Sequence, residues 1–370
     1  MPDEKFPVEN FTRKALMKQP LTASEIAALV YLRDEGQIAR LKKGACQIRT
    51  QFFGNHVFLY GFVYFSTYCR NLCSFCNYAA KNKMNRYRKS VQEILAVCRS
   101  LQFSGVHLID LTMGEDPHYL THEGDALLEL VKFVRSQVDL PLMLSPGVIG
   151  EHLLESLAEL GVAWYACYQE TYNPNLFQQL RVGQSFTRRL GAKQKAREAN
   201  LLVEDGMLLH LGESEQDIIS SILAMQRLGV HQARVMAYVP PEPNGLPKRR
   251  SHNLEEETVI AILRHVFPDR LIPASLDIEG LKGLSSRLKA GANVVSSIIP
   301  PMTGLRGVSQ TTLDIDEGRR TVENVKEVLK SLNLEVAPLS MYFALVQRFR
   351  EEQRMGTMGN IGEERVGLLL

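Results

Sequence analysis

Short runs of apolar and β-branched residues recur along most of the chain, and stretches with helical apolar spacing separate them. Runs of this length between polar or turn residues are typical of buried strands. Eight such runs occur, at residues 57–65, 106–113, 141–145, 162–168, 201–209, 233–239, 271–276 and 293–299. A regular alternation of strand and helix predicts parallel strands joined by right-handed crossovers.

Two of the intervening stretches show the helical pattern most clearly. Residues 90–101 carry apolar side chains at the spacing of one helix face. Residues 214–229 start at Ser214, a residue type that caps helix N-termini, and end at Gly229, which suits a C-terminal cap. Both stretches are therefore predicted to be helices that connect strands.

The fold class predicted by this pattern is α/β, a single (β/α)8 TIM barrel with an N-terminal helical extension and a C-terminal helix. An open, doubly wound sheet is the alternative, but no glycine-rich dinucleotide loop follows the first strand. We expect a helical extension at 1–50, broken at Pro20, the barrel at 51–310, and a helical extension packed on the barrel at 311–370. Within the last segment, residues 314–332 predict an amphipathic helix, followed by a partly frayed tail.

Composition narrows the possible partners. The 370 residues carry a formal net charge of only +2, which argues against a broad surface for nucleic acid or membrane. The basic run Lys248-Arg249-Arg250 is interpreted as a solvated loop. No secretory leader is recognised at the N-terminus, and no apolar stretch approaches membrane-spanning length. We therefore expect a monomeric, cytoplasmic protein.

Three of the six cysteines lie in the segment YCRNLCSFC, directly after the first predicted strand. Cys69, Cys73 and Cys76 would thus stand on the catalytic face of a barrel. The other three, Cys46, Cys98 and Cys167, occur singly and are interpreted as small buried hydrophobes. In a long chain without a leader, clustered thiols favour metal binding or catalysis over a disulfide framework.

Three clustered thiols are one too few for an ordinary structural zinc site, and no second cysteine pair follows at a suitable spacing. Three thiolates suit a 4Fe–4S cluster in which one iron keeps an open coordination position. A cysteine-rich loop that binds no metal is the alternative.

The Cys-x3-Cys-x2-Cys spacing, with aromatic Phe75 before the third cysteine, resembles the radical S-adenosylmethionine (SAM) superfamily. This resemblance implies that SAM binds the open iron. It also implies that an external one-electron reductant, such as flavodoxin or ferredoxin, drives its cleavage to a 5′-deoxyadenosyl radical. That radical takes hydrogen from the substrate.

Further segments resemble the biotin synthase and hydrogenase-maturation branch of this superfamily. TMGED (112–116) is similar to the branch's Gly-Gly-Glu element, with Met113 in place of the first glycine. Glu170 and Arg189 match the residues that grip the methionine ammonium and carboxylate, although a surface ion pair on a helix is the alternative. The resemblance places SAM against a larger set, which comprises Tyr68, Phe75, Met113, Gly114, Glu115, Ser145, Glu170, Arg181 and Arg189.

Other blocks, notably ASLDIEG (274–280), resemble the lysine mutases of that branch, and this likeness spans about residues 50 to 310. It implies that L-lysine is rearranged to 3-methylornithine, the first step of pyrrolysine biosynthesis. In that reaction the chain breaks into a glycyl radical and an aminobutene, which rejoin at another carbon.

Lysine carries two ammonium groups and one carboxylate, so a closed site needs anions at two points and a cation near one of them. The resemblance assigns Arg234 to the carboxylate, Ser275 and Asp277 to the α-ammonium, and Asp110 to the distal ammonium. A buried ion pair between Arg234 and Asp110 is the alternative. The apolar lining that would keep such a site dry is expected from Tyr60, Phe62, Tyr64, Met113, Met236 and Tyr238, for which core packing is the alternative.

Two rival functions stay open. One is a different reaction of the same branch, such as hydrogenase maturation, sulfur insertion or another amino-acid mutation. Sulfur insertion needs a second cluster, and Cys98 and Cys167 are a poor set of ligands for one. The other rival is a non-catalytic iron–sulfur protein, which would require a fourth protein ligand.

Overall fold

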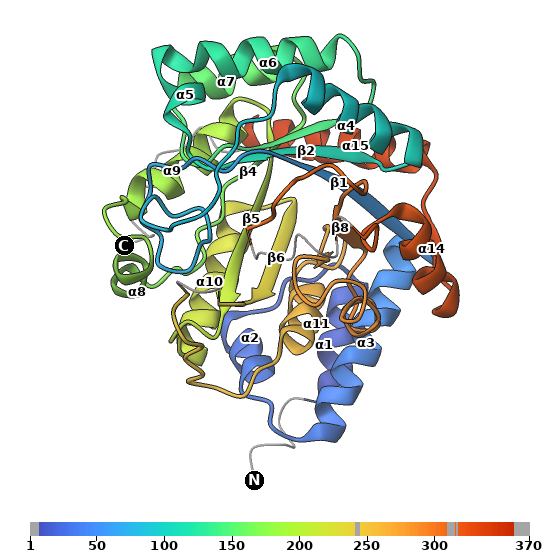
Figure 1. Cartoon of the computed structure of the whole chain (residues 1–370). Coiled ribbons are helices and arrows are strands. Elements are labelled where there is room, and N and C mark those ends of the chain that lie inside the picture. The colour runs from blue at the N-terminus through green and yellow to red at the C-terminus, as the bar shows by residue number, and fades with distance from the viewer. Residues whose placement is uncertain (1–6, 241–244, 309–314, 316, 359–370) are drawn as a thin grey trace.

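The structure is a computed structural model that describes residues 7–240, 245–308, 315 and 317–358. Its centre is a nearly closed barrel of eight parallel strands surrounded by helices (Figure 1). The strands are β1 (His56–Ser66), β2 (Leu108–Met113), β3 (Leu142–Ser145), β4 (Trp164–Ala166), β5 (Leu202–Leu209), β6 (Gln232–Ala237), β7 (Pro273–Ser275) and β8 (Val294–Ile298). Each lies within or next to a predicted run, so the barrel is confirmed and the doubly wound sheet is excluded.

Strand order explains why the barrel is only nearly closed. The strands follow β6-β5-β4-β3-β2-β1-β8-β7, and the remaining gap lies between β6 and β7. There a single bridge joins Gln232 to Leu271, and the Ala233 amide donates to the Leu271 carbonyl at 3.0 Å. The two strands are therefore tied at their starts, and the C-terminal end of the barrel is left wider.

Helices that connect the strands cover the outside of the barrel. Their bounds are α4 (Val91–Ser104), α5 (Pro117–Leu120), α6 (Asp125–Arg135), α7 (Glu151–Glu159), α8 (Pro174–Leu180), α9 (Phe186–Glu198), α10 (Glu215–Leu228), α11 (Glu256–Val266) and α12 (Leu284–Lys289). The predicted caps of α10 are confirmed, because Ser214 accepts a hydrogen bond from the Asp217 amide and Gly229 is left-handed at φ 64°. Among the described residues, no helix has both the length and the apolar character needed to cross a membrane.

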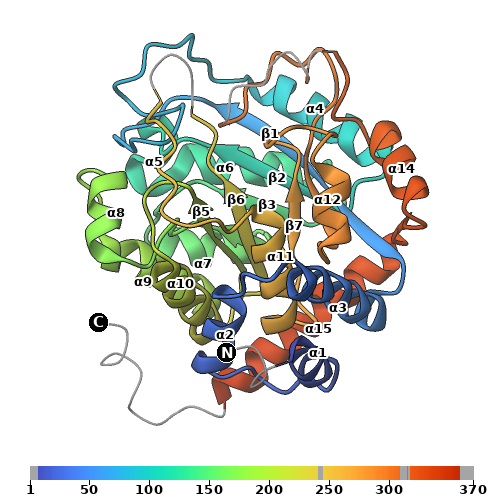
Figure 2. The ribbon, with the colours of Figure 1, turned by 90° about the horizontal axis from the view of Figure 1, so that it is seen from below.

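Three helices precede the barrel, as predicted. They are α1 (Val8–Leu16), α2 (Ala23–Val30) and α3 (Glu35–Phe53), and Pro20 lies between the first two. Figure 2 shows them gathered with α15 at one end of the molecule. Arg49 anchors α3 there by donating to the carbonyls of Leu288 and Ala292. The division of the chain at residues 50 and 310 stays a prediction.

The C-terminal region differs from the expectation in one respect. Helix α14 (Val322–Ser331) occupies the later part of the predicted 314–332 helix, while residues 309–314 and 316 lie outside the described residues. The expected frayed tail is wrong for residues 335–358, which form β9 (Glu335–Val336) and the twenty-residue helix α15 (Leu339–Met358). The reason is apolar burial, because the Tyr342, Val346 and Phe349 side chains of α15 are buried against the barrel.

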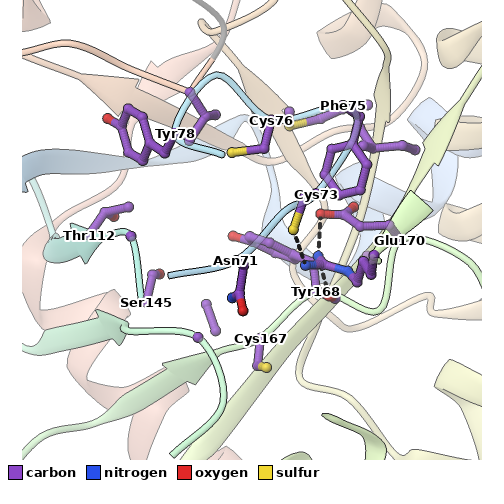
Figure 3. Close-up of a pocket in the computed structure, with 18 of the residues that line it drawn as sticks. Asn71, Cys73, Phe75, Cys76, Tyr78, Thr112, Ser145, Cys167, Tyr168 and Glu170 are labelled. Carbon is purple, nitrogen blue, oxygen red and sulfur yellow. Dashed lines mark hydrogen bonds and ion pairs between the residues drawn. The ribbon is translucent and has the colours of Figure 1, made fainter. Parts of the chain in front are cut away.

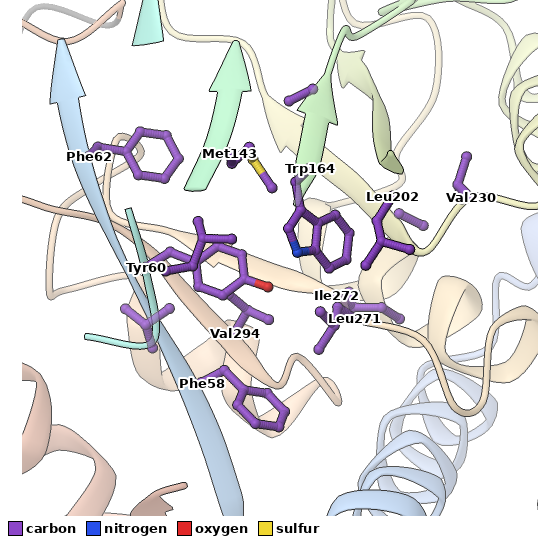
Figure 4. Close-up of a cluster of buried hydrophobic side chains, with 14 of the residues drawn as sticks. Phe58, Tyr60, Phe62, Met143, Trp164, Leu202, Val230, Leu271, Ile272 and Val294 are labelled. Carbon is purple, nitrogen blue, oxygen red and sulfur yellow. The ribbon is translucent and has the colours of Figure 1, made fainter. Parts of the chain in front are cut away.

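Helix α15 closes the N-terminal end of the barrel. The Tyr342 ring lies 5.4 Å from the Phe58 ring, and its hydroxyl is 2.8 Å from the Tyr60 hydroxyl. Figure 4 shows Phe58 and Tyr60 beside Trp164 within the cluster of buried side chains. This end of the barrel is a packed core, as is usual for the fold, so open space is confined to the C-terminal end.

The closure by α15 makes a stability prediction. Replacing Tyr342 with alanine should lower the free energy of unfolding by about 3 to 5 kcal/mol, because a large cavity opens and the Tyr60 hydroxyl loses its partner. Urea denaturation of the metal-free protein measures the change. The neighbouring Phe343, which is 44% exposed, is the control, and Phe343→Ala should cost less than about 1 kcal/mol. Equal losses in both variants would show that α15 does not close the core.

Candidate active site

A cavity of about 210 Å³ lies at the C-terminal ends of the strands. Figure 3 shows side chains from the loop after β1 and from β2 to β5 directed around it. Its wall includes twelve of the predicted site residues, which are Cys69, Cys73, Phe75, Cys76, Met113, Gly114, Glu115, Ser145, Glu170, Arg181, Arg189 and Arg234. The fold thus brings together residues that are far apart in the sequence.

The cysteines belong to a long segment after β1, residues 67–89, which we call the Cys loop. Its position depends on Gly114 at the end of β2, where a Cβ atom would lie 2.2 Å from the Tyr68 carbonyl oxygen. The same atom would lie 2.7 Å from Cβ of Cys69. Only glycine therefore allows the Cys loop to pack this closely on β2.

All three cysteines of the Cys loop are free thiols at the cavity wall. Cys73 Sγ accepts hydrogen bonds from Gln184 Nε2 at 2.9 Å and from Arg181 Nη1 at 3.5 Å. Burial raises the pKa of the Cys69 and Cys76 thiols, so the thiolate form of each is disfavoured in the metal-free protein. A bound metal centre would offset this effect, because its positive charge stabilises the thiolates.

The arrangement of these thiols bears on which metal group fits. Within the described ranges, no three His, Cys, Asp or Glu side chains converge closely enough to hold a single metal ion. A 4Fe–4S cluster is larger than one ion and takes a thiolate at each ligated iron. Three separate thiols around an open cavity, with donors aimed at one sulfur, fit such a cluster.

Glu115 and Arg189 form a buried ion pair beside the cysteines. Arg189 Nη2 lies 3.0 Å from Glu115 Oε1, and the two side chains are only 4% and 6% exposed. Arg70 contacts the second oxygen at 3.3 Å. Gly147 permits this packing, because a Cβ there would lie 2.1 Å from Cγ of Glu115 and its φ is +81°. The alternative of a surface ion pair is therefore wrong for Arg189.

Glu170 is held in an unusual backbone conformation at the end of β4. Its φ is +69°, which costs a non-glycine residue about 1 to 3 kcal/mol. Hydrogen bonds to the β5 backbone enforce it, because the Glu170 amide donates to the Gly206 carbonyl and the Leu208 amide donates back. Its carboxylate pairs with Arg181 at 3.0 Å, so Glu170 and Arg189 each have a different partner.

Arg234 presents one free donor in the cavity wall. Its Nε lies 2.5 Å from Glu204 Oε1, and its Nη1 donates to Ser296 at 3.1 Å. Its Nη2 is buried and has no partner within the part of the chain that the structure describes. The alternative of an Arg234–Asp110 ion pair is wrong, since Glu204 takes that role. An unsatisfied guanidinium edge is suited to a carboxylate ligand.

Asp110 lies behind the cavity wall, beneath Ser145. The Ser145 hydroxyl contacts its two carboxylate oxygens at 2.9 and 3.0 Å. Burial, together with the nearby charge of Glu204, raises the pKa of Asp110 to about 7. The side chain is thus poised between its neutral and ionised forms near neutral pH.

Asp277 and Ser275 also lie just behind the wall, where the following residue Ile278 faces the cavity. Asp277 Oδ1 is 2.7 Å from Arg320 Nη1 in an almost fully buried pair. Its other oxygen accepts hydrogen bonds from Tyr64 and Ser297 at 2.8 and 2.9 Å. Ser275 Oγ accepts a hydrogen bond from the Asp277 amide.

The remaining predicted residues differ in whether they line the cavity. The Tyr68 ring does not face the cavity and instead lies under the Arg88 guanidinium, 3.9 Å away. Of the expected apolar lining, Met113, Met236 and Tyr238 line the cavity. Tyr60, Phe62 and Tyr64 are buried outside it. Cys167 is buried as expected, but it also lines the cavity and accepts a hydrogen bond from Arg189.

Sequence reasoning missed Glu204, Gln184, Ser297 and Arg320. Glu204 had a detectable signal, because two acidic residues in succession interrupt an otherwise apolar strand. Arg320 had none, since nothing in the sequence links it to a carboxylate 43 residues away.

Comparison with known proteins agrees with this geometry. The family model of the Radical SAM superfamily matches residues 63–224. The chain is 42% identical to the 3-methylornithine synthase of Methanosarcina acetivorans, over 90% of this chain and 95% of that protein. It is 27% identical to the FeFe hydrogenase maturase subunit HydE of Thermotoga maritima, over 79% of this chain and 81% of that one.

The crystal structure of methylornithine synthase (PylB) superposes with a TM-score of 0.86 at 40% identity, covering 90% of this chain and 99% of that chain. This likeness extends over nearly the whole of both molecules, including the barrel and the helices around it. The chain therefore belongs to the 3-methylornithine synthase family of the radical SAM superfamily.

Proposed function

We propose that this enzyme rearranges L-lysine to 3-methylornithine, using a 4Fe–4S cluster held by Cys69, Cys73 and Cys76 together with SAM. The observation that carries the proposal is the single buried Nη2 of Arg234, a residue of the cavity wall, which has no partner among the described residues, with Asp110 and Asp277 behind that wall. These three charges complement the carboxylate and two ammonium groups of lysine. Family membership supports the reaction type, since radical SAM enzymes use this cluster, SAM and a reductant.

When bound, the cluster and SAM supply a carbon-centred radical that abstracts hydrogen from an unactivated carbon of the substrate. The protein's own part begins with the thiolates, of which Cys73 is stabilised by the donors of Gln184 and Arg181. An external electron carrier, flavodoxin or ferredoxin, is the proposed source of the reducing electron.

The methionine end of SAM is assigned to the charged groups next to the Cys loop. Glu115 and Glu170 offer carboxylates for its ammonium, and Arg189 offers a planar fork for its carboxylate. Each is already paired with an opposite charge at 3.0 Å in the folded chain. The remaining residues assigned to SAM are Phe75, Met113, Gly114, Ser145 and Arg181, whereas the ring of Tyr68, which the sequence also assigned to SAM, lies under Arg88 outside the cavity.

Lysine is assigned to the charges deeper in the barrel. Arg234 Nη2 would donate to the substrate carboxylate, while Glu204 fixes the opposite edge of the guanidinium. Ser275 and Asp277 would accept from the α-ammonium, and Asp110 from the distal one. Since Asp277 is already held by Tyr64, Ser297 and Arg320, its carboxylate needs little reorganisation when lysine arrives.

The apolar part of the wall would exclude water from the reacting fragments. Met207, Met236, Tyr238 and Ile278 line the cavity beside Arg234. A dry site prevents radical fragments from escaping or being quenched before they recombine.

The direct test is turnover of lysine. Anaerobic protein with a reconstituted cluster, dithionite, SAM and L-lysine should give 5′-deoxyadenosine and 3-methylornithine, identified by mass spectrometry. Deoxyadenosine formed while lysine stays unchanged would overturn the substrate and leave another reaction of the branch. A cluster that binds no SAM would instead favour the non-catalytic iron–sulfur protein.

The proposed role of Asp277 in binding lysine can be separated from its structural role. Asp277→Asn should lower kcat/KM for lysine at least about thirtyfold, because the substrate ammonium loses its anionic partner. The substitution also removes the buried ion pair between Asp277 and Arg320, so the double variant Asp277→Asn/Arg320→Gln is made beside it. The double variant should keep the cluster's absorbance and still fail to turn over lysine.

The matched control for Asp277 is Glu279→Gln, the same acid-to-amide change two residues away at an exposed side chain. It should leave turnover unchanged. Recovery of lysine activity in the double variant would show that Asp277 does not bind substrate.

The raised pKa of Asp110 leads to a prediction about the pH dependence of turnover. Because its pKa in the free enzyme is about 7, the carboxylate becomes neutral as the pH falls below that value and can no longer pair with an ammonium. The value of kcat/KM for lysine should therefore fall about tenfold per pH unit below about pH 7. Ser145→Ala, which removes hydrogen bonds to the ionised form, should move this limb to higher pH. A profile identical in wild type, Ser145→Ala and Asp110→Asn would contradict the assignment.

A further inference from the structure

Two segments around the cavity mouth contain no acidic residue. The Cys loop has six lysines and arginines and no aspartate or glutamate, and residues 171–191 have three arginines and again no acid. The whole chain is almost balanced, with 43 basic and 41 acidic residues. The absence of acids from both segments is therefore a local feature of this part of the molecule.

These two segments lie side by side. The Ser74 amide donates to the Leu180 carbonyl at 2.8 Å, and Gln184 Nε2 donates to Cys73 Sγ at 2.9 Å. Figure 1 shows the Cys loop in blue next to α8 and α9. The two segments are therefore in contact beside Cys73.

Part of the positive charge of these two segments is not used internally. Arg88, Arg181 and Arg189 are each paired with a buried or nearly buried carboxylate. Lys81, Lys83 and Arg188, by contrast, are exposed, and no ion pair involves them within the described ranges. Arg70 is half-exposed and reaches Glu115 only at 3.3 Å.

Two apolar side chains of the same two segments are also exposed. Leu72 precedes Cys73 in the chain and is 40% exposed, and Val182 in the neighbouring segment is 46% exposed. We call the six residues Arg70, Leu72, Lys81, Lys83, Val182 and Arg188 the cationic face. An apolar centre with a charged rim is the usual composition of a protein interface.

The described residues include no second redox centre that could feed the thiols. Cys46 donates to the Lys289 carbonyl, Cys98 is a buried residue of α4, and Cys167 accepts a hydrogen bond from Arg189. Within the described part of the chain, no other group of side chains could hold a metal. Under the proposed function, the electron for the cluster would be delivered by another molecule.

We propose that an acidic one-electron carrier protein of the flavodoxin or ferredoxin class docks on the cationic face. This inference rests on the proposed function. One electron leaves the carrier, which is oxidised, and enters the cluster held by Cys69, Cys73 and Cys76, which is reduced. The lysines steer and orient an acidic partner, and Leu72 and Val182 supply the small apolar contact of a transient complex.

Binding tests the docking without turnover. Titration calorimetry of the full-length, reconstituted protein with oxidised, negatively charged flavodoxin, and separately with ferredoxin, gives the dissociation constant at low and high salt. Lys81→Glu/Lys83→Glu should weaken binding of the carrier about tenfold, and the wild-type affinity should fall as salt rises. The control Lys43→Glu/Lys132→Glu makes the same charge change at exposed positions on α3 and α6 and should not alter the affinity. Failure of both carriers to bind the wild type would overturn the proposal.

Electron delivery gives a second readout. With the reduced carrier, the Lys81→Glu/Lys83→Glu variant should form 5′-deoxyadenosine about tenfold more slowly than wild type. With dithionite, which needs no docking surface, the two rates should be equal. Equal losses with both reductants, or equal losses in the control variant, would overturn the docking site. If wild-type protein with dithionite leaves lysine unchanged, the proposed function fails, while the calorimetric measurement still decides the docking.

Discussion

The close approach of the Cys loop to Gly114 is the constraint on which the rest of the site depends. A Cβ atom at position 114 would overlap the Tyr68 carbonyl oxygen, so the loop could not lie on the end of β2. With the loop in place, Arg70 and Arg189 meet Glu115 from two sides, and Gln184 beside α9 reaches Cys73. One absent side chain thus allows the segments after β1, β2 and β4 to meet around a single cavity.

Burial of charge is the second organising factor. An isolated charge in this barrel would be costly, yet lysine and SAM both require ionised partners. The structure meets both needs where it pairs a buried charge and still leaves it some bonding capacity, as in Arg234, which binds Glu204 and keeps Nη2 free. Asp277 is likewise held in place by Arg320, at 2.7 Å. Groups fixed in this way need little reorganisation when a ligand binds.

The parts predicted from sequence are those whose signal is local. Parallel strands buried on both faces give continuous apolar runs, so all eight were found, and the Cys loop follows directly after the first. Helix α15 was missed because charged residues separate its buried positions, as in the stretch from Gln347 to Arg354. The partners of Asp277 and Arg234 depend on contacts across the barrel, and the positive φ of Glu170 depends on hydrogen bonds to β5. No local pattern encodes these features.

The two ends of the barrel have different roles. Helix α15 and the aromatic residues around Tyr342 fill one end, so the chemistry is confined to the other. There, cations face in two directions. The arginines directed inward are paired with buried carboxylates, and their remaining donors can bind small ligands. The exposed lysines of the cationic face, by contrast, have no ion-pair partner among the described residues. The chain as a whole is nearly neutral, whereas the Cys loop and residues 171–191 contain no acidic residue. These two segments would therefore create a local positive potential on the cluster side of the molecule.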